Sequence, residues 1–248
     1  MAWPGRNIFL PDRAKNGQSV ENLVLLGLPE KEFSILAPHL DHVGLENGAV
    51  LEREGARIDE VFFINRGVAL MIVETVEGKS VEVGLIGRGS MVGLQAAAGM
   101  EDFTHGVAML IPGDAFRVKV DALKDVLPSA PELRRKLLRR LAIRSVELAQ
   151  NAACNRIHAV KERISRLLLQ MHSRLDADLI SATHVALSKM VGTDRPTVTL
   201  TLAALEKDGA VEAGHASIAI TNRKKLEKQA CACYLISKRF DAELGLRT

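Results

Sequence analysis

The sequence predicts an α+β protein with a β-rich front half, a long helix and a helical rear half that ends in a small hairpin. Glycines separate short apolar runs between Val43 and Val120, which is typical of an antiparallel sheet. Neither glycine nor proline occurs from Glu132 to Ala153, and further on Gly192 separates two short helical patterns. The 248 residues are 47% hydrophobic and 25% charged, a composition that forms real cores and excludes disordered and collagen-like chains.

The charges divide the chain into two unequal halves. Residues 1–128 carry 12 basic and 18 acidic side chains, a net charge of −6, whereas residues 129–248 carry 21 basic and 12 acidic ones, a net charge of +9. The whole chain, at +3, hides this difference. The split indicates two domains with different partners, and the expected partner of the basic rear domain is a polyanion.

The start of the chain has no clear periodicity. We therefore expect residues 1–20 to be a disordered tail, followed over residues 21–40 by short helices that Pro29 and Pro38 delimit. No apolar run has the length of a signal peptide or a membrane span, and three cysteines form no disulfide framework. These features predict a soluble protein of the reducing cytoplasm.

Turn signals recur every 6 to 12 residues through the front half. They separate apolar runs at 61–67, 68–78 and 80–89, the second of which ends in a Glu77-Gly78 turn. This texture predicts a compact antiparallel sandwich or barrel, and we assign residues 21–128 to it.

After Pro131 the pattern becomes helical. A helix of about 20 residues, roughly 30 Å long at 1.5 Å per residue, is longer than one small domain needs and commonly packs on its twin. We therefore assign residues 129–154 to a dimerisation helix. Its expected contact residues are Leu133, Leu137, Leu141, Leu148 and Ala152. A second amphipathic helix is expected over residues 155–174, with Ile157 in its apolar stripe.

The segment 183–208 has the signals of a helix-turn-helix. Thr183 and Asp194 are N-cap residues for two short helices, and Gly192 supplies the turn between them. Val198 and Leu202 face inward in the second helix. Two short strands are expected next, at 211–213 and 217–220, with a turn at 214–216. Residues 155–248 thus read as a winged helix-turn-helix, whose second helix fits the major groove of B-DNA.

Four ordered segments now resemble the Crp/Fnr superfamily of bacterial transcription regulators, over roughly residues 23–235. VEVGLIGRGSMVG (81–93) resembles that superfamily's β-roll, a cyclic-nucleotide-binding-like double-stranded β-helix. NAACNRIHAVKERISRLLL (151–169) resembles its linker, THVALSKMVGTDRPTVTLTLAALEKD (183–208) its helix-turn-helix, and LEKQACACY (226–234) the C-terminal helix of one branch.

The resemblance implies a homodimer, a β-roll sensor domain and binding of double-stranded DNA, with RNA polymerase as a further partner. Arg195 stands at the first base-reading position, where a bidentate pair with guanine would contribute about 1 to 3 kcal/mol of discrimination. The expected DNA-binding residues are Thr183, Asp194, Arg195, Pro196, Thr197, Thr199, Leu200, Lys207 and His215. Leu200 replaces the family's second arginine, so the usual half-site is not assumed.

The effector pocket implied by the resemblance departs from that of cyclic-nucleotide binders. Its expected residues are Arg88, Gly93, Leu94, Gln95, Thr104 and His105. Where such binders have Gly-Glu for the ribose and Arg-Ser or Arg-Ala for the phosphate, this chain has Gly93-Leu94 and Thr104-His105. A buried phosphate would lack its guanidinium, so binding of cyclic AMP in the usual mode is not expected, and the effector is unknown.

Other cofactors and chemistries have little support in the sequence. The front half has no cysteine, which excludes a four-thiolate cluster in the sensor, whereas His39, His42 and His105 leave haem open. Cys231 and Cys233 are two residues apart on an expected helix and point to different sides, so we expect structural thiols and no metal. No catalytic arrangement is found, and we expect no enzyme.

Two functions follow from these observations. The first is a homodimeric, sequence-specific DNA-binding transcription regulator with a β-roll sensor domain. The alternative is a small-molecule-binding or scaffold protein of the same fold whose DNA-binding unit is weakened, because Leu200 and the expected wing tip at residues 215–217 carry little charge.

Overall fold

The computed structural model describes residues 13–74, 76–77, 80–214 and 216–246. The first element is a small hairpin of β1 (Ala14–Lys15) and β2 (Gln18–Ser19). Before it, the buried Arg13 donates hydrogen bonds to the carbonyls of Leu25 and Leu28, at 2.7 and 2.6 Å. The expectation of a disordered tail is therefore wrong for residues 13–20, and its first twelve residues lie outside the described part of the chain.

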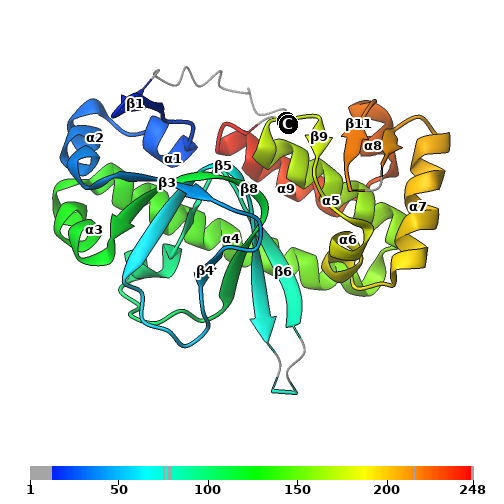
Figure 1. Ribbon diagram of the computed structural model, residues 1–248, viewed down its shortest axis with the longest axis horizontal. Coiled ribbons are helices and arrows are strands. Elements are labelled where there is room, and N and C mark those ends of the chain that lie inside the picture. Colours follow the sequence, from blue (N-terminus) through cyan, green and yellow to red (C-terminus); the bar gives the residue numbers. More distant parts are fainter. Residues whose placement is uncertain (1–12, 75, 78–79, 215, 247–248) are drawn as a thin grey trace.

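The front half is a β-roll built on one antiparallel sheet (Figure 1). Its strands are β3 (Asp41–Leu45), β4 (Val50–Glu52), β5 (Glu60–Glu74), β6 (Ser80–Ile86), β7 (Met91–Val92) and β8 (Gly106–Lys119). The order is β3-β8-β5-β6, with β4 on β8 and β7 on β5. Short helices lie at one end: α1 (Leu23–Leu26), α2 (Glu30–Leu36), η1 (Ala37–His39), η2 (Leu94–Ala98), α3 (Val120–Val126) and η3 (Leu127–Ser129). This confirms the predicted β domain.

Strand β5 runs through the glycine that the sequence suggested as a boundary. Gly67 has φ +87°, and a Cβ there would lie 2.6 Å from the carbonyl oxygen of Ile111 on β8. The pairing of β5 with β8 shifts register on both sides of this position. Gly67 is therefore a bulge that bends one long strand and not a turn between two strands. The predicted hairpin between β5 and β6 is present, while Gly78 of its turn lies outside the described residues.

The long helix α4 (Pro131–Ile157) is 27 residues long, and α5 (Val160–Leu175) follows after a two-residue break. Ile157 belongs to the last turn of α4 and is 69% exposed, so its assignment to the stripe of the second helix is wrong. Every residue of α5 from Arg163 to Arg174 is buried. A helix buried on all sides is a central element, and here it lies between the β-roll and the C-terminal unit.

The C-terminal unit is a winged helix-turn-helix. Its elements are β9 (Leu179–Ile180), α6 (His184–Val191), α7 (Arg195–Lys207), β10 (Val211–Ala213), β11 (Ile218–Ile220), α8 (Arg223–Gln229) and α9 (Cys233–Glu243). The two predicted strands are confirmed, and β9 completes a three-stranded sheet that the sequence analysis missed.

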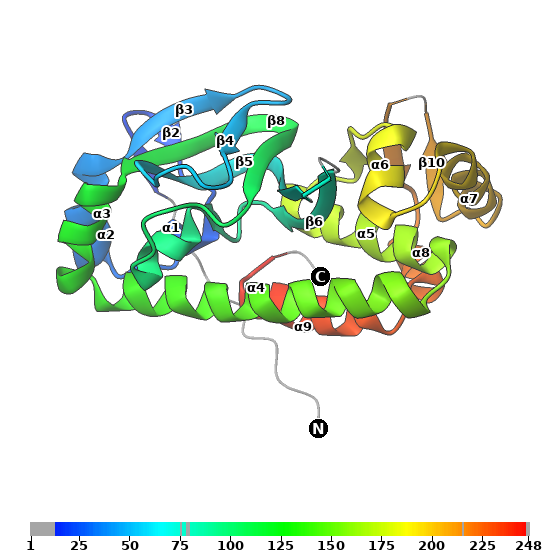
Figure 2. The same cartoon turned by 90° about the horizontal axis from the view of Figure 1, so that it is seen from below.

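The two halves share a continuous apolar core. Val68, Leu70 and Leu85 of the β-roll pack in the same cluster as the apolar residues of α5 and of the helix-turn-helix. On the other side, α9 runs beside the second half of α4 (Figure 2). The expected boundary at residue 155 therefore separates helices but not hydrophobic cores. Within the described residues, no helix is both long and apolar enough to span a membrane.

Candidate DNA-binding face, sensor pocket and thiol cluster

Side-chain caps fix the start of each helix in the helix-turn-helix, as the sequence predicted. The Thr183 hydroxyl accepts a hydrogen bond from the Ala186 amide at 3.1 Å, and the Asp194 carboxylate accepts one from the Thr197 amide at 2.7 Å. The hydrogen bond from Thr197 lowers the pKa of Asp194 below its ordinary value. Gly192 has φ +62°, a conformation that costs glycine little, and it ends α6. The caps and the turn set the angle at which α7 leaves α6.

One face of helix α7 is exposed to solvent and carries both polar and apolar side chains. The opposite face packs in the core. Val198, Leu202 and Leu205 are fully buried. The exposed residues include Arg195, Pro196, Thr199, Leu200 and Lys207, whereas Thr197 is half-buried. Leu200 is 73% exposed, and the Thr199 hydroxyl lies 2.9 Å from Nδ1 of His184 on α6. The structure therefore brings the predicted reading residues of α7 onto one outward surface.

The wing follows α7 directly. Strand β10 pairs with β11 from Val211 to Ala213, and the Glu206 carboxylate accepts a hydrogen bond from the Ala213 amide at 3.2 Å. This bond ties the last turn of α7 to the wing. The predicted contact residue His215, at the wing tip, lies outside the described residues.

The sensor residues around Gly93 surround a buried carboxylate that the sequence analysis did not single out. Gly93 begins η2, and Leu94 and Gln95 are buried there. The Gly93 amide donates a hydrogen bond to the carboxylate of Glu52, which reaches it from β4 and is 3% exposed. Burial raises the pKa of Glu52 to about 7, against the opposing effects of the Gly93 bond and of Arg144.

His105 lies beside the same buried carboxylate. Its Nε2 lies 3.5 Å from the Glu52 carboxylate, and its Nδ1 lies 3.1 Å from the Thr104 hydroxyl. Burial and the charge of Arg144 lower its pKa to about 4. The guanidinium of Arg144 comes from α4 and donates to the Ser90 hydroxyl at 2.8 Å. A residue of the long helix is thus part of the sensor interior.

The remaining predicted sensor residues lie elsewhere. Arg88 forms an ion pair at 2.9 Å with Asp176, the residue that follows α5. This ion pair joins the β-roll to the C-terminal unit. Of the histidines considered for haem, His39 is exposed on η1 and His42 contacts Asp114 at 3.1 Å. The structure therefore does not bring His39, His42 and His105 together at one site.

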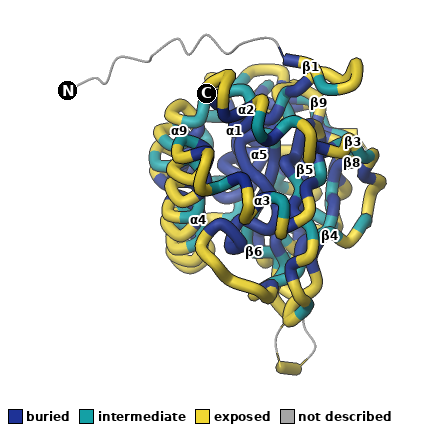
Figure 3. Tube along the Cα trace, turned by 90° about the vertical axis from the view of Figure 1, so that its left-hand side faces the viewer, coloured by how far each residue is buried: buried dark blue, intermediate teal, exposed yellow. Residues whose placement is uncertain are grey.

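The predicted dimer contacts divide between the inside and the outside of the chain. Leu133 and Leu137 are fully buried in the core of the β-roll, and Leu141 and Leu148 pack against the chain's own clusters. Only Ala152 is exposed. The exposed residues of α4 include an apolar row that we call the outer stripe: Leu138, Ala142, Val146, Ala149 and Ala153. Figure 3 shows these outer turns of α4 as largely exposed.

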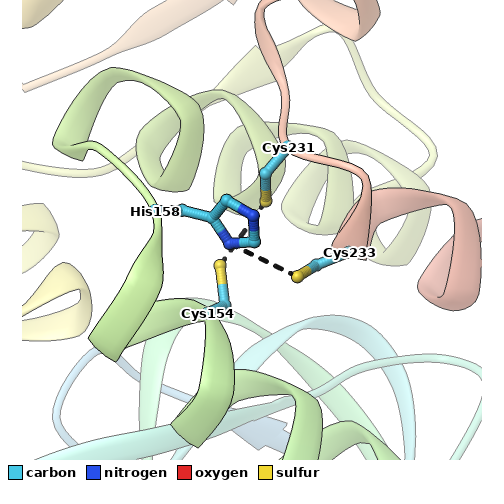
Figure 4. A group of neighbouring side chains, drawn as sticks. All are labelled: Cys154, His158, Cys231 and Cys233. Atoms are coloured by element: carbon cyan, nitrogen blue, oxygen red, sulfur yellow. Dashed lines mark hydrogen bonds between the residues drawn. The ribbon is translucent and has the colours of Figure 1, made fainter.

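The three cysteines converge with one histidine (Figure 4). Sγ of Cys154 lies 3.5 Å from Sγ of Cys231, and Sγ of Cys233 lies 3.5 Å from Nδ1 of His158. All four ligand atoms lie within 4.8 Å of one another. The argument that Cys231 and Cys233 diverge on one helix is wrong, because Cys231 precedes α9 and only Cys233 is helical. The spacing of Cys154 and His158, four residues apart at a helix end, could have predicted their side of the cluster.

Sequence profiles of known domains match both halves of the chain. The profile of the cyclic nucleotide-binding domain matches residues 42–129, and that of the Crp-like helix-turn-helix domain matches residues 162–229. The chain belongs to the Crp/Fnr superfamily. It is thus a Crp-like transcription regulator with a cyclic-nucleotide-binding-type domain and a DNA-binding helix-turn-helix, as the resemblance implied.

Relatives of this Crp/Fnr protein cover most of its length. The CRP-like cAMP-activated global transcriptional regulator of Mycobacterium tuberculosis is 23% identical over 214 residues, which are 84% of this chain and 96% of the relative. FixK2 from Bradyrhizobium japonicum has a similar structure, with a TM-score of 0.67 at 18% identity over 78% of this chain and 98% of its own. A CRP/FNR-family regulator from Thermus thermophilus has a TM-score of 0.61 at 22% identity, over 77% and 98%. These structures support the fold and do not confirm the branch with the ACxCY segment.

Proposed function

We propose that this Crp/Fnr regulator is a homodimer that reads specific DNA sequences with α7 in the major groove. The outward face of α7 carries the proposal, because it combines Arg195 at the first turn with Thr199 and the unusually exposed Leu200. The guanidinium of Arg195 pairs with the O6 and N7 atoms of a guanine, and Leu200 contacts a thymine methyl group. Exposure of a leucine side chain to water is unfavourable, and contact with a methyl group would remove part of that exposure.

The outer stripe of α4 is the proposed dimer interface. Leu138 and Val146 are 38% and 43% exposed, and the alanines between and beyond them allow two helices to approach closely. The stripe advances by four, four, three and four residues, a spacing that keeps it on one face of a helix. The two copies would then pack along α4 with Leu133 and Leu137 still inside each β-roll.

The sensor pocket supports an effector other than cyclic AMP bound in the usual mode. The Gly93 amide, which begins η2, already donates to the Glu52 carboxylate. A phosphate at that amide would lie beside a second acidic group, and Thr104 and His105 supply no guanidinium. The buried guanidinium of Arg144 already interacts with Glu52 and Ser90. His105 is neutral near pH 7 because burial lowers its pKa to about 4.

Fluorescence anisotropy with a duplex from the protein's own upstream region tests the proposal, at about 150 mM salt because phosphate contacts depend on ionic strength. We expect tighter binding to this duplex than to a shuffled duplex, and no change on adding cyclic AMP. Arg195→Ala should weaken specific binding by about 1 to 3 kcal/mol. Arg57→Ala is the matched control, because Arg57 is exposed on the β-roll and pairs only with Asp59 among the described residues.

Equal affinity for both duplexes would favour the scaffold alternative, and so would an Arg195→Ala variant that binds like the Arg57→Ala control. A saturable increase in DNA affinity with cyclic AMP would contradict the proposal for the sensor pocket while leaving the DNA-reading proposal intact.

A further inference from the structure

The buried thiol cluster lies at the junction of the two halves of the molecule. Cys154 is in the last turn of α4, His158 follows that helix directly, and Cys231 and Cys233 come from the segment that leads into α9. All three cysteines are buried and form a small cluster of their own, separate from the apolar cores. Figure 4 shows the three thiols and the imidazole directed toward one another.

We propose that Cys154, Cys231, Cys233 and Nδ1 of His158 bind one Zn²⁺ ion in a tetrahedral site. Three thiolates and an imidazole are a donor set of structural zinc sites. With Zn–S distances of about 2.3 Å, a tetrahedral site places two sulfurs about 3.8 Å apart. The distance between Sγ of Cys154 and Sγ of Cys231 is 3.5 Å, and that between Sγ of Cys233 and Nδ1 of His158 is also 3.5 Å.

The dimensions of the cluster fit one ion. In a tetrahedral zinc site two sulfurs lie about 3.8 Å apart, and here all four ligand atoms lie within 4.8 Å of one another, so they need to move closer by about 1 Å at most. Small rotations of the side chains would bring all four atoms to bonding distance. A larger cluster of several metal ions would need the ligand atoms further apart.

Neighbouring polar groups suit an anionic zinc–thiolate centre. Three thiolates and one Zn²⁺ carry a net charge of −1, and the positive charge of Arg166 acts on both Cys154 and Cys231. The amide of Gln150 donates a hydrogen bond to Sγ of Cys233 at 2.9 Å. Metal binding replaces the thiol protons and releases them to solvent.

The ion would fix the hinge between the dimer helix and the DNA-binding unit. Two of its ligands flank the end of α4: Cys154 lies in the last turn, and His158 follows the helix, two residues before α5 begins at Val160. The other two ligands tie this point to the start of α9, which runs beside α4. The direction in which α5 leaves α4 therefore depends on an occupied site. This consequence concerns the same hinge that positions α7, but the metal site does not depend on the proposed DNA contacts.

Titration of the full-length protein with Co²⁺ tests the site, because cobalt replaces zinc and reports its ligands in the visible spectrum. The protein is freed of metal, reduced with a phosphine and assayed for three titratable thiols. We expect thiolate-to-cobalt charge-transfer bands and tetrahedral d–d bands that saturate at one Co²⁺ per chain and disappear on adding Zn²⁺. Bands that are missing from fully reduced wild-type protein would overturn the proposal, whatever the variants do.

Three variants test the assignment of His158 and the role of Gln150. His158→Ala should shift the d–d bands and weaken cobalt binding more than tenfold, while His39→Ala, at an exposed histidine of η1, should leave both unchanged. Gln150→Ala keeps all four ligands and should weaken binding by about 10- to 100-fold, since partners of ligand atoms orient them. Equal spectra for His158→Ala and His39→Ala, with both variants folded by circular dichroism, would exclude His158 and overturn the four-ligand site.

Discussion

The two ends of α4 are held in the molecule by different chemistry. At the N-terminal end, Leu133 and Leu137 are fully buried among apolar side chains of the β-roll. At the C-terminal half, charged groups are buried instead: Glu147 pairs with Arg140 at 2.9 Å and with Arg174 of α5 at 3.1 Å. The thiol cluster lies at the last turn.

This difference indicates which end can respond to a signal. Apolar contacts depend little on protons or ions, so the packing of Leu133 and Leu137 is expected to stay in place. Buried ion pairs and thiols depend on charge state and partners, because an uncompensated buried charge is costly. Movement of the DNA-binding unit relative to the β-roll should therefore occur at the C-terminal end of α4.

Removing the charge at the centre of the polar end should have the largest effect. Glu147→Gln keeps the side-chain volume but leaves Arg140 and Arg174 without their closest carboxylate. We expect the free energy of unfolding to fall by about 3 to 5 kcal/mol. Urea denaturation at fixed protein concentration measures it. Glu132→Gln is the control: Glu132 also pairs with an arginine, Arg135, but at an exposed site, where a loss below about 1 kcal/mol is expected. Equal losses would mean that burial does not distinguish these pairs.

At the apolar end, two adjacent leucines should behave differently. Leu137→Ala removes a fully buried side chain from the sensor core and should cost about 2 to 5 kcal/mol of unfolding free energy. Leu138→Ala changes the outer stripe and should cost under about 1 kcal/mol within the chain, while raising the dimer dissociation constant measured by analytical ultracentrifugation. If Leu137→Ala weakened the dimer and Leu138→Ala did not, the interface would lie where the sequence first placed it.

Local signals predicted most of the fold. The caps at Thr183 and Asp194, the turn at Gly192 and the two wing strands could be predicted because each depends on residues within a few positions. The predicted dimer contacts were harder to assign. Leu133 and Leu137 repeat at helical spacing, but spacing alone does not say whether an apolar face meets a partner chain or the chain's own sensor domain.

Long-range contacts explain what the sequence analysis missed. Glu52 lies more than 50 residues from the predicted residue His105, and no short pattern connects either of them to Arg144 on α4. Cys154 and Cys231 are 77 residues apart, and the geometry of Cys231 depends on the helix break at residues 230–232. Tertiary folding creates these sites, so residue spacing within one segment could predict at most the side of the thiol cluster formed by Cys154 and His158.

The smallest expected effect concerns the middle of α4, where Arg144 reaches the sensor pocket. Glu52 has an ordinary pKa of 4.5 that burial raises to about 7, so the folded chain holds its proton more tightly than the unfolded chain does. The cost of the buried carboxylate is absent below pH 4.5 and complete above pH 7, and stability falls between them.

Glu52→Gln keeps an acceptor for the Gly93 amide but cannot ionise. We expect it to stabilise the protein by about 1 to 3 kcal/mol at pH 8 and by much less near pH 5. His105 adds a pH dependence of its own between pH 6.5 and 4, because burial lowers its pKa to about 4, but wild type and variant share it and it cancels in their difference. Thermal unfolding across this pH range measures the gain, with Glu54→Gln at a nearby exposed position as the control. A gain that is independent of pH, or shared by the control, would show that the Glu52 carboxylate does not carry this cost.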